Sequence, residues 1–425
     1  ADAAAALASE HGWHARAARA VLAWAGPPFQ YRLPDAATSA RLAAALATLA
    51  GESVELAARL LARRAAEHVL DPDASLAASL RRRAVDAALS CGDAEVLAEV
   101  LMTPYSGIWE HVEPARRLAL ADACTERARA EGNAIACARG GLLRLGELIG
   151  LGELARFDAE VDAIEQAAIE QHEPAGRYQV LLHRTTRALA GGELASAERF
   201  AGQALALGRR AEIAGAFELF AAVLTVIRRE QGRLGELDGL EPALFTGHPS
   251  PAARVLSVWA LAEHGVGDRA RPLLARVLDE MLPSLAAQPT GVANAALLAR
   301  ASFLLGEPRA AEPLAALLAP FAERVVLRGT LTAHGPASHF LALLAWLRGE
   351  HGEAGARFEH ARGFCRRMGA PGWGAHVDAD AARWHAERGD RPFALECAQR
   401  AARAARALHM QALAADAESL RERLR

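Results

Sequence analysis

A glycine recurs in this chain at a nearly fixed interval, and this recurrence constrains the fold more than any other feature. Seven glycines are separated by 40, 40, 33, 41, 43 and 40 residues: Gly152, Gly192, Gly232, Gly265, Gly306, Gly349 and Gly389. A repeat of this length is typical of helical-repeat proteins, in which each unit is a pair of helices. We expect each glycine to end the first helix of its pair, because glycine readily adopts the left-handed backbone conformation.

A small residue at a fixed distance from the glycine supports this interpretation. Five residues after each glycine come Phe157, Ala197, Leu237, Ala270, Ala311, Ala354 and Ala394, so five of the seven are alanine. An alanine lets the second helix lie close against the first. Ala197, Ala354 and Ala394 are therefore predicted to be buried where the two helices of a unit cross.

The composition favours helices throughout. Alanine and leucine dominate the 425 residues, and only 5% are aromatic; Ala, Leu, Arg and Glu are the residues that cost least in a helix interior. We therefore predict an all-α, tetratricopeptide-like helical-repeat solenoid, with antiparallel helix pairs stacked into a right-handed superhelix. Residues 1–33 are predicted to form N-terminal helices. Residues 34–425 are predicted to form the solenoid, with Asp35 capping its first helix and the C-terminal helix capping its end.

Three stretches break the helical pattern. Residues 103–113 place Tyr105 and Trp109 in a predicted loop, where they either fill a gap between helices or face a binding partner. Proline and glycine interrupt the unit after Gly232, within residues 245–251. Residues 321–336 are too long for a repeat turn and contain several β-branched residues, so they predict an irregular connection.

The chain contains no lysine, since all 48 basic residues are arginine. This excludes a P-loop lysine, a kinase lysine and a pyridoxal Schiff base within these residues. The net charge of −3 is close to balance, so we expect no direct binding to nucleic acid or to an anionic membrane. No apolar run reaches the roughly 18 to 20 residues of a membrane span.

The cysteines and histidines predict neither disulfides nor a metal site. The five cysteines are scattered and odd in number, and the first residues lack the basic segment of a signal peptide, so we expect reduced thiols and a cytoplasmic protein. His11 with His14, and His360 with Cys365, lack a second pair at zinc-ligand spacing. We therefore expect no metal and no cofactor, and we assign no catalytic residue.

The connection at residues 321–336 supplies the candidate ligand site. Its donors Arg328 and His334, with His339 just beyond, suit an anion or a polar terminus. Trp373, one unit later, adds apolar area. We predict that the connection folds inward and that these four residues approach one pocket; the alternative is a connection that only packs between repeats.

Two groups of charged residues leave alternatives open. Asp378, Asp380 and His385 lie on one predicted helix, where they form either a general acid–base pair or a solvated face, and we favour the solvated face. The run from Arg228 to Glu230 lies at a predicted helix end. There it forms either a structural ion pair or part of a functional patch.

One region resembles a known family. The run LLAPFAERVVLRGTLTAHGPASHFLALLAWLRGEHGEAGARFEHARGFCRRMGAPGWGAHVDADAARWHAERGD, with GRYQVLLHRTTRALAGGELASAERFAGQALALGRRA before it, resembles the C-terminal helical-repeat region of large bacterial signalling ATPases. These proteins join a STAND-type AAA ATPase to a nucleotide cyclase, a LuxR-type DNA-binding domain or a kinase. The resemblance extends roughly from Asp35 to the end and is strongest after Arg177. Several aromatic positions of the family are His or Ala here, and no ATPase, cyclase or DNA-binding segment is present.

Two functions are consistent with these observations. The first is a binding rather than catalytic role: an interaction or sensor module whose concave groove takes a protein, a peptide or a small effector. For this module the resemblance implies a role in signal transduction and transcription regulation, with an ATPase domain of the same polypeptide as one partner. The alternative is a stand-alone enzyme or small-molecule-binding protein with its pocket in the concave face, since a fold does not determine a function.

Overall fold

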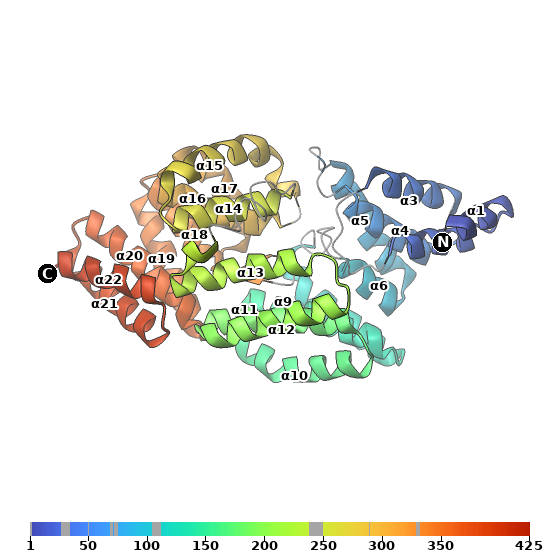
Figure 1. Cartoon of the computed structure of the whole chain (residues 1–425), viewed down its shortest axis with the longest axis horizontal. Helices are drawn as coiled ribbons and strands as arrows, with labels where there is room; N and C mark the ends of the chain where they lie inside the picture. Colours follow the sequence, from blue (N-terminus) through green and yellow to red (C-terminus); the bar gives the residue numbers. More distant parts are fainter. Residues whose placement is uncertain are drawn as a thin grey trace.

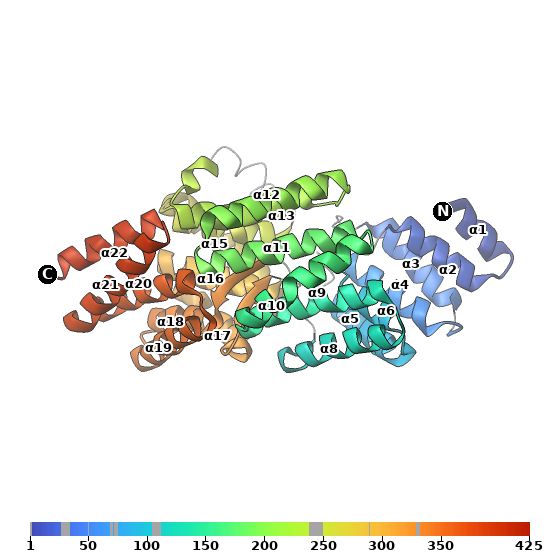
Figure 2. The same cartoon turned by 90° about the horizontal axis from the view of Figure 1, so that it is seen from below.

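The structure is a computed structural model that describes residues 2–26, 35–49, 51–68, 71, 75–103, 112–237, 250–288, 290–328 and 332–425. Within these residues the chain is almost entirely helical, and consecutive helices pack in pairs. Figure 1 shows the two termini at opposite ends of an elongated molecule, and Figure 2 shows the same helices from below. The prediction of an all-α helical-repeat solenoid is confirmed.

Most of the described helices precede the hairpin. They begin with α1 (Asp2–Glu10), α2 (His14–Trp24), α3 (Ala36–Leu49), α4 (Val54–Ala66), α5 (Ser75–Cys91), α6 (Ala94–Leu101) and α8 (Pro114–Ala130). They continue with α9 (Ala134–Leu151), α10 (Leu154–Glu170), α11 (Pro174–Gly191), α12 (Leu194–Arg210), α13 (Ala216–Gln231), α14 (Pro251–Glu263), α15 (Gly267–Met281), α16 (Gly291–Leu305) and α17 (Ala311–Leu318).

A short hairpin and five further helices complete the described chain. They are β1 (Val325–Arg328), β2 (Thr332–Pro336), α18 (Ala337–Leu347), α19 (His351–Met368), α20 (Pro371–Glu387), α21 (Arg391–Ala407) and α22 (Gln411–Arg423). Short 3₁₀ segments lie at Leu234–Leu237, Leu282–Ala287, Pro308–Ala310 and Ala319–Phe321. In the unit after Gly232, the structure describes a four-residue 3₁₀ turn at Leu234–Leu237, and residues 238–249 lie outside the described part.

The repeat register predicted from the glycines is confirmed. All seven turn glycines have a positive φ, between 65° and 79°. Of the residues five positions later, all except Leu237 are buried, and Ala197, Ala354 and Ala394 are fully inaccessible to solvent. In these three units the small side chain therefore lies buried, as expected where the two helices of a unit meet.

The N-terminal helices pack directly on the helices that follow them. Asp35 accepts the backbone N–H of Thr38 at 2.8 Å, which confirms it as the cap of α3. Ala18 of α2, Leu42 of α3 and Leu60 of α4 share one apolar cluster. The division of the chain at residues 33 and 34 remains a prediction.

The connection at residues 321–336 is a β-hairpin, so the prediction of an irregular connection is corrected. β1 and β2 are antiparallel, with Leu327 opposite Ala333 and a bulge between Val325 and Leu327. Val325 contributes to the apolar core around α9 and α19, whereas its neighbour Val326 contributes to the core of α14–α18. Successive residues of a strand face opposite sides, so a strand can join two cores here.

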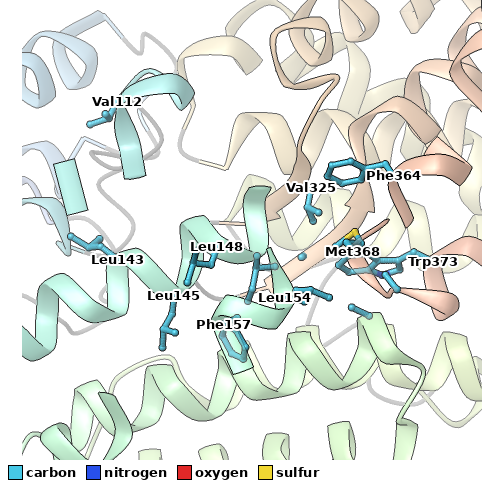
Figure 3. Close-up of a cluster of buried hydrophobic side chains, with 14 of the residues drawn as sticks. Val112, Leu143, Leu145, Leu148, Leu154, Phe157, Val325, Phe364, Met368 and Trp373 are labelled. Atoms are coloured by element: carbon cyan, nitrogen blue, oxygen red, sulfur yellow. The ribbon is translucent and has the colours of Figure 1, made fainter. Parts of the chain in front are cut away.

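The chain closes on itself around this hairpin. Residues 325–423 pack against residues 134–231, and we call this contact the seam: β1 lies on α9, β2 and α20 lie on α11, and α22 lies on α13. Figure 1 shows the red C-terminal helices against the ends of the green ones. In Figure 3, Met368 and Trp373 approach Leu154 of α10 from across the seam.

Glycines allow the close approach at the seam. A methyl group on Gly152 would lie 2.9 Å from the Phe364 ring, and one on Gly192 would lie 2.7 Å from Leu408. A methyl group on Gly372 of α20 would lie 2.9 Å from the backbone carbonyl oxygen of Leu189. The helices of the seam are thus closer together than any other residue would permit at these positions.

Several sequence predictions lie outside the described residues. Tyr105 and Trp109 lie there, as do most of residues 245–251 and Thr330.

Candidate functional site

A small cavity, lined by both charged and apolar side chains, lies beside the hairpin, between the helices that the seam brings together. Its volume is about 40 Å³, and it is lined by Val226, Arg229, Glu230, Trp259, Glu263, Leu297, Arg300, Ala333, His334, Gly335, Pro336, His339, Phe340, Trp373 and His376. We call it the axial cavity. One enclosed water needs about 10–15 Å³, so the cavity holds on the order of three waters or a ligand of a few heavy atoms.

The structure brings three of the four predicted ligand-binding residues together. His334, His339 and Trp373 line the axial cavity. Arg328 does not line it, although its charge acts on the His334 ring. The role of these residues in binding a ligand remains a prediction.

Hairpin geometry positions the predicted residues. Gly335 has φ +102° and lies against the Trp373 indole, where a methyl group would be 3.5 Å from the ring. This contact places β2 and its His334 next to α20. The backbone N–H of Ala337 donates to the carbonyl oxygen of Arg324 at 2.9 Å, which fixes the start of α18 and therefore His339.

A buried ionic network forms the polar wall of the cavity. Glu263 Oε1 accepts from Arg229 Nη2 and from Arg300 Nε, both at 3.0 Å. Arg300 Nη1 then donates to Asp380 Oδ2 at 2.6 Å, and Asp380 also contacts His339 Nε2 at 2.9 Å. These residues come from α13, α14, α16, α18 and α20, so the network links both sides of the seam.

A second arm of the network crosses the seam directly. His376 Nε2 lies 2.7 Å from both Arg229 Nη1 and Glu230 Oε2. The nitrogen accepts from the guanidinium when it carries no proton and donates to the carboxylate when it does. The position of this proton therefore determines which residue of α13 holds α20.

The acidic groups of the network are ionised. Burial alone would raise the pKa of Glu230, but Arg229 and His376 outweigh it and lower the pKa to about 2. Burial of Glu263 is likewise outweighed, by Arg229 and Arg300, and its pKa is also about 2. Despite complete burial, Arg300, His339 and Arg383 hold the pKa of Asp380 well below its usual range.

His334 is the contrasting member of the cavity wall. Burial, together with the charges of Arg328 and Arg229, lowers the pKa of His334 to about 3, so the ring is neutral. Its Nε2 is buried and has no hydrogen-bond partner among the described residues. An unpaired buried nitrogen is unfavourable, and this one borders a space large enough for a ligand.

Sequence reasoning missed the arginine at the centre of the network. Arg300 lies within the apolar run NAALLARASFLL, and a lone charge in such a run indicates a buried ion pair. Its partner Asp380 is 1% exposed and Asp378 is 8% exposed, so the prediction of a solvated face is wrong for both. In the run from Arg228 to Glu230, Arg229 and Glu230 pair with each other within the network, which supports the structural ion pair over the functional patch.

Two other features are absent from the described part of the chain. It contains no group of three or more His, Cys, Asp or Glu side chains able to hold a metal ion. It also contains no helix long and apolar enough to cross a membrane.

The fold and the cavity define a helical-repeat protein that closes on itself around a small polar site. No family model and no curated protein matches the chain. Among solved structures, the chain aligns with a "Circular tandem repeat protein with novel repeat topology and enhanced subunit contact surfaces", at 16% identity over 99% of this chain and 93% of that one. The TM-score is 0.16, so the class assigned here rests on the helix pairs themselves.

Proposed function

We propose that this chain is a helical-repeat sensor module, in which a small effector bound in the axial cavity regulates how firmly the seam is closed. One observation carries the proposal. The cavity wall combines residues from both sides of the seam, with Arg229 and Glu230 on one side and His334, His339 and His376 on the other. A molecule that binds there interacts with both sides at once.

The size of the cavity favours a small effector over a peptide. A peptide needs an open groove with backbone partners or several side-chain pockets. The axial cavity has a volume of about 40 Å³ and is bordered by the hairpin, so it has no room for an extended peptide. The small-molecule form of the hypothesis is therefore the one we develop.

The effect on a partner follows from the closure. An effector that binds only the closed seam stabilises it by mass action, which changes the surface that the outer helices present. The resemblance of residues 321–409 to the repeat regions of STAND-type signalling ATPases supports an ATPase domain of the same polypeptide as the partner. In that setting the module transmits the presence of the effector to the ATPase.

A thermal-unfolding screen tests the proposal. Small carboxylates, phosphates, amines and neutral amides are each added at constant ionic strength. At least one class should raise the melting temperature of the chain. The same class should fail on Ala333→Leu, which fills the cavity without removing a charge. Ala354→Leu, which overpacks a buried site outside the cavity, should keep the response. If no class acts, or if Ala333→Leu responds like the parent, the proposal is wrong.

A further inference from the structure

The polar groups that remain free around the axial cavity define what it can bind. Within the described residues, Arg300 uses Nε for Glu263 and Nη1 for Asp380, which leaves Nη2 without a partner. His334 Nε2 is also unpaired. The cavity thus offers at least one free guanidinium donor and one imidazole nitrogen.

Most acceptors in the cavity wall are already occupied. Both oxygens of Glu230 are used, one by Arg229 and one by His376. Both oxygens of Asp380, which holds Arg300 and His339 without lining the cavity itself, are used by Arg300, His339 and Arg383. Glu263 accepts twice at Oε1, and only its Oε2 is free among the described residues. A cationic ligand would find one acceptor here, beside two guanidinium groups.

We propose that the axial cavity binds a small carboxylate, held by Arg300 and His334, that also carries a hydroxyl group donating to Glu263 Oε2. The inference rests on the proposed function and names its ligand class. A carboxylate accepts from the free N–H of Arg300 and from a protonated Nε2 of neutral His334. The hydroxyl donates to the one carboxylate oxygen of the wall that no described residue uses.

The electrostatic potential and the shape agree with this ligand. Burial, together with the positive charges of Arg328 and Arg229, keeps His334 neutral, and these two charges favour an anion beside it. Trp259, Phe340 and Trp373 form apolar walls, which leave room for a ligand of a few atoms but not for a second charged group. Glycolate, a hydroxyl-bearing acid of five heavy atoms, is the probe that fits these requirements.

The binding test compares four small probes by isothermal titration and thermal unfolding at constant ionic strength. Glycolate should bind and raise the melting temperature. Acetate, which lacks the hydroxyl, should bind more weakly, by roughly tenfold for the loss of one hydrogen bond to a charged group. Glycolamide, which lacks the charge, and methylammonium, which reverses it, should have no effect.

Two matched variants locate the site. His334→Leu removes an unpaired buried nitrogen, so it should melt at the same temperature as the parent or higher, yet bind glycolate at least about tenfold more weakly. His183→Leu is the control, because His183 is also a buried histidine with an unpaired Nε2 but lies outside the cavity. It should bind glycolate like the parent.

The outcomes separate this inference from the proposed function. Unchanged glycolate binding by His334→Leu overturns the inference, as does stabilisation by methylammonium but not by glycolate. If neither carboxylate binds while another class stabilises the chain and fails on Ala333→Leu, the sensor proposal stands and the ligand class is wrong. If no class acts, both are wrong.

Discussion

The turn glycines of this chain have the same backbone conformation but fall into two groups with different neighbours. Gly152, Gly192 and Gly232 lie in the seam, where an added methyl group would come within 3.0 Å of Phe364, Leu408 or Ala412. An added methyl group would meet no atom of a neighbouring segment within 4 Å at the other four turn glycines, Gly265, Gly306, Gly349 and Gly389. In the first group, glycine is therefore needed both for the positive φ of the turn and for the close contact. In the second group, it is needed for the positive φ alone.

This difference shows how a repeat protein acquires a site. In a regular solenoid each unit contacts only the units next to it, so all of its turns have equivalent surroundings. Here three consecutive turns contact segments far along the chain. The buried ionic network of Arg229, Glu263, Arg300 and Asp380 lies between the same parts of the chain. The seam, rather than any single repeat, creates the axial cavity. The predictions that follow test whether the seam behaves differently from the outer turns.

The largest effect is expected from Arg300. Arg300→Met leaves the buried carboxylates Glu263 and Asp380 with fewer partners, and breaking a buried pair in this way costs about 3–5 kcal/mol. Urea unfolding measures the change. Arg357→Met is the matched control, because Arg357 forms an exposed pair with Glu353 four residues away, and its loss should cost under about 0.5 kcal/mol. Equal losses in the two variants would show that the network does not stabilise the fold.

Acid should destabilise the fold through the buried His183, which lies on α11. Burial lowers the pKa of His183 from 6.5 to about 4, so the unfolded chain binds a proton at a higher pH than the folded chain. The stability from this group is complete above pH 6.5 and is lost as the pH falls towards 4. The total loss is at most about 3 kcal/mol.

Unfolding free energies measured between pH 7 and 4 test this dependence. His183→Leu should flatten the slope in that window, and replacing the exposed His11 by Leu should not. The lowered pKa values of Glu230 and Glu263 act in a separate window, because their stabilisation is lost as the pH falls from 4.5 to about 2. A slope that His183→Leu leaves unchanged would place the acid-sensitive group elsewhere.

Two glycines of helix α20 allow a direct comparison of the seam with its surroundings. Gly372→Ala forces a methyl group against the carbonyl oxygen of Leu189, so it should destabilise by about 1–3 kcal/mol. Gly374→Ala meets only the Cβ of Cys365 at 3.6 Å. It should be neutral or stabilise by up to about 1 kcal/mol, because alanine favours a helix. Thermal melts that show the same sign for both would contradict the close packing of α20 on α11.

The smallest difference is expected between turn glycines of the two groups. Gly232→Ala and Gly389→Ala both place alanine at a positive φ, which costs about 1 kcal/mol. Gly232→Ala also brings a methyl group to 2.9 Å from the Cβ of Ala412. It should therefore lose about 1 kcal/mol more than Gly389→Ala, measured by denaturant midpoints. Equal losses would mean that α22 can move away from this turn without cost.

The repeat was predictable from the sequence because it depends on local rules. A glycine with φ near 75° and an alanine five residues later depend on one helix pair, and both recur along the chain. The sequence predicts His334 and His339 because donors cluster around one irregular segment, and it predicts Trp373 because an aromatic residue one unit later adds apolar area. The β pairing of that segment was not predicted, since it depends on two cores that flank Val325 and Val326.

The seam and its charges were not predictable by the same reasoning. Asp380 was interpreted as solvated because a carboxylate in a helix normally faces water, and its partner Arg300 lies 80 residues earlier. Nothing local marks that pairing except an arginine in an apolar run. Likewise, the glycine period is the same at Gly232 and at Gly389, although only the first touches a distant helix.

A cross-link between Gly232 and Ala412 tests the closure of the chain most directly. Disulfides need Cβ atoms about 3.5–4.5 Å apart, and a Cβ at position 232 would lie 2.9 Å from that of Ala412, within reach after a small shift. Gly232→Cys with Ala412→Cys should form an intramolecular disulfide on mild oxidation, identified by peptide mass mapping. Gly389→Cys with Ala412→Cys, with its glycine in an open turn, should not. If the first pair cross-links no more than the second, the seam is not closed in solution.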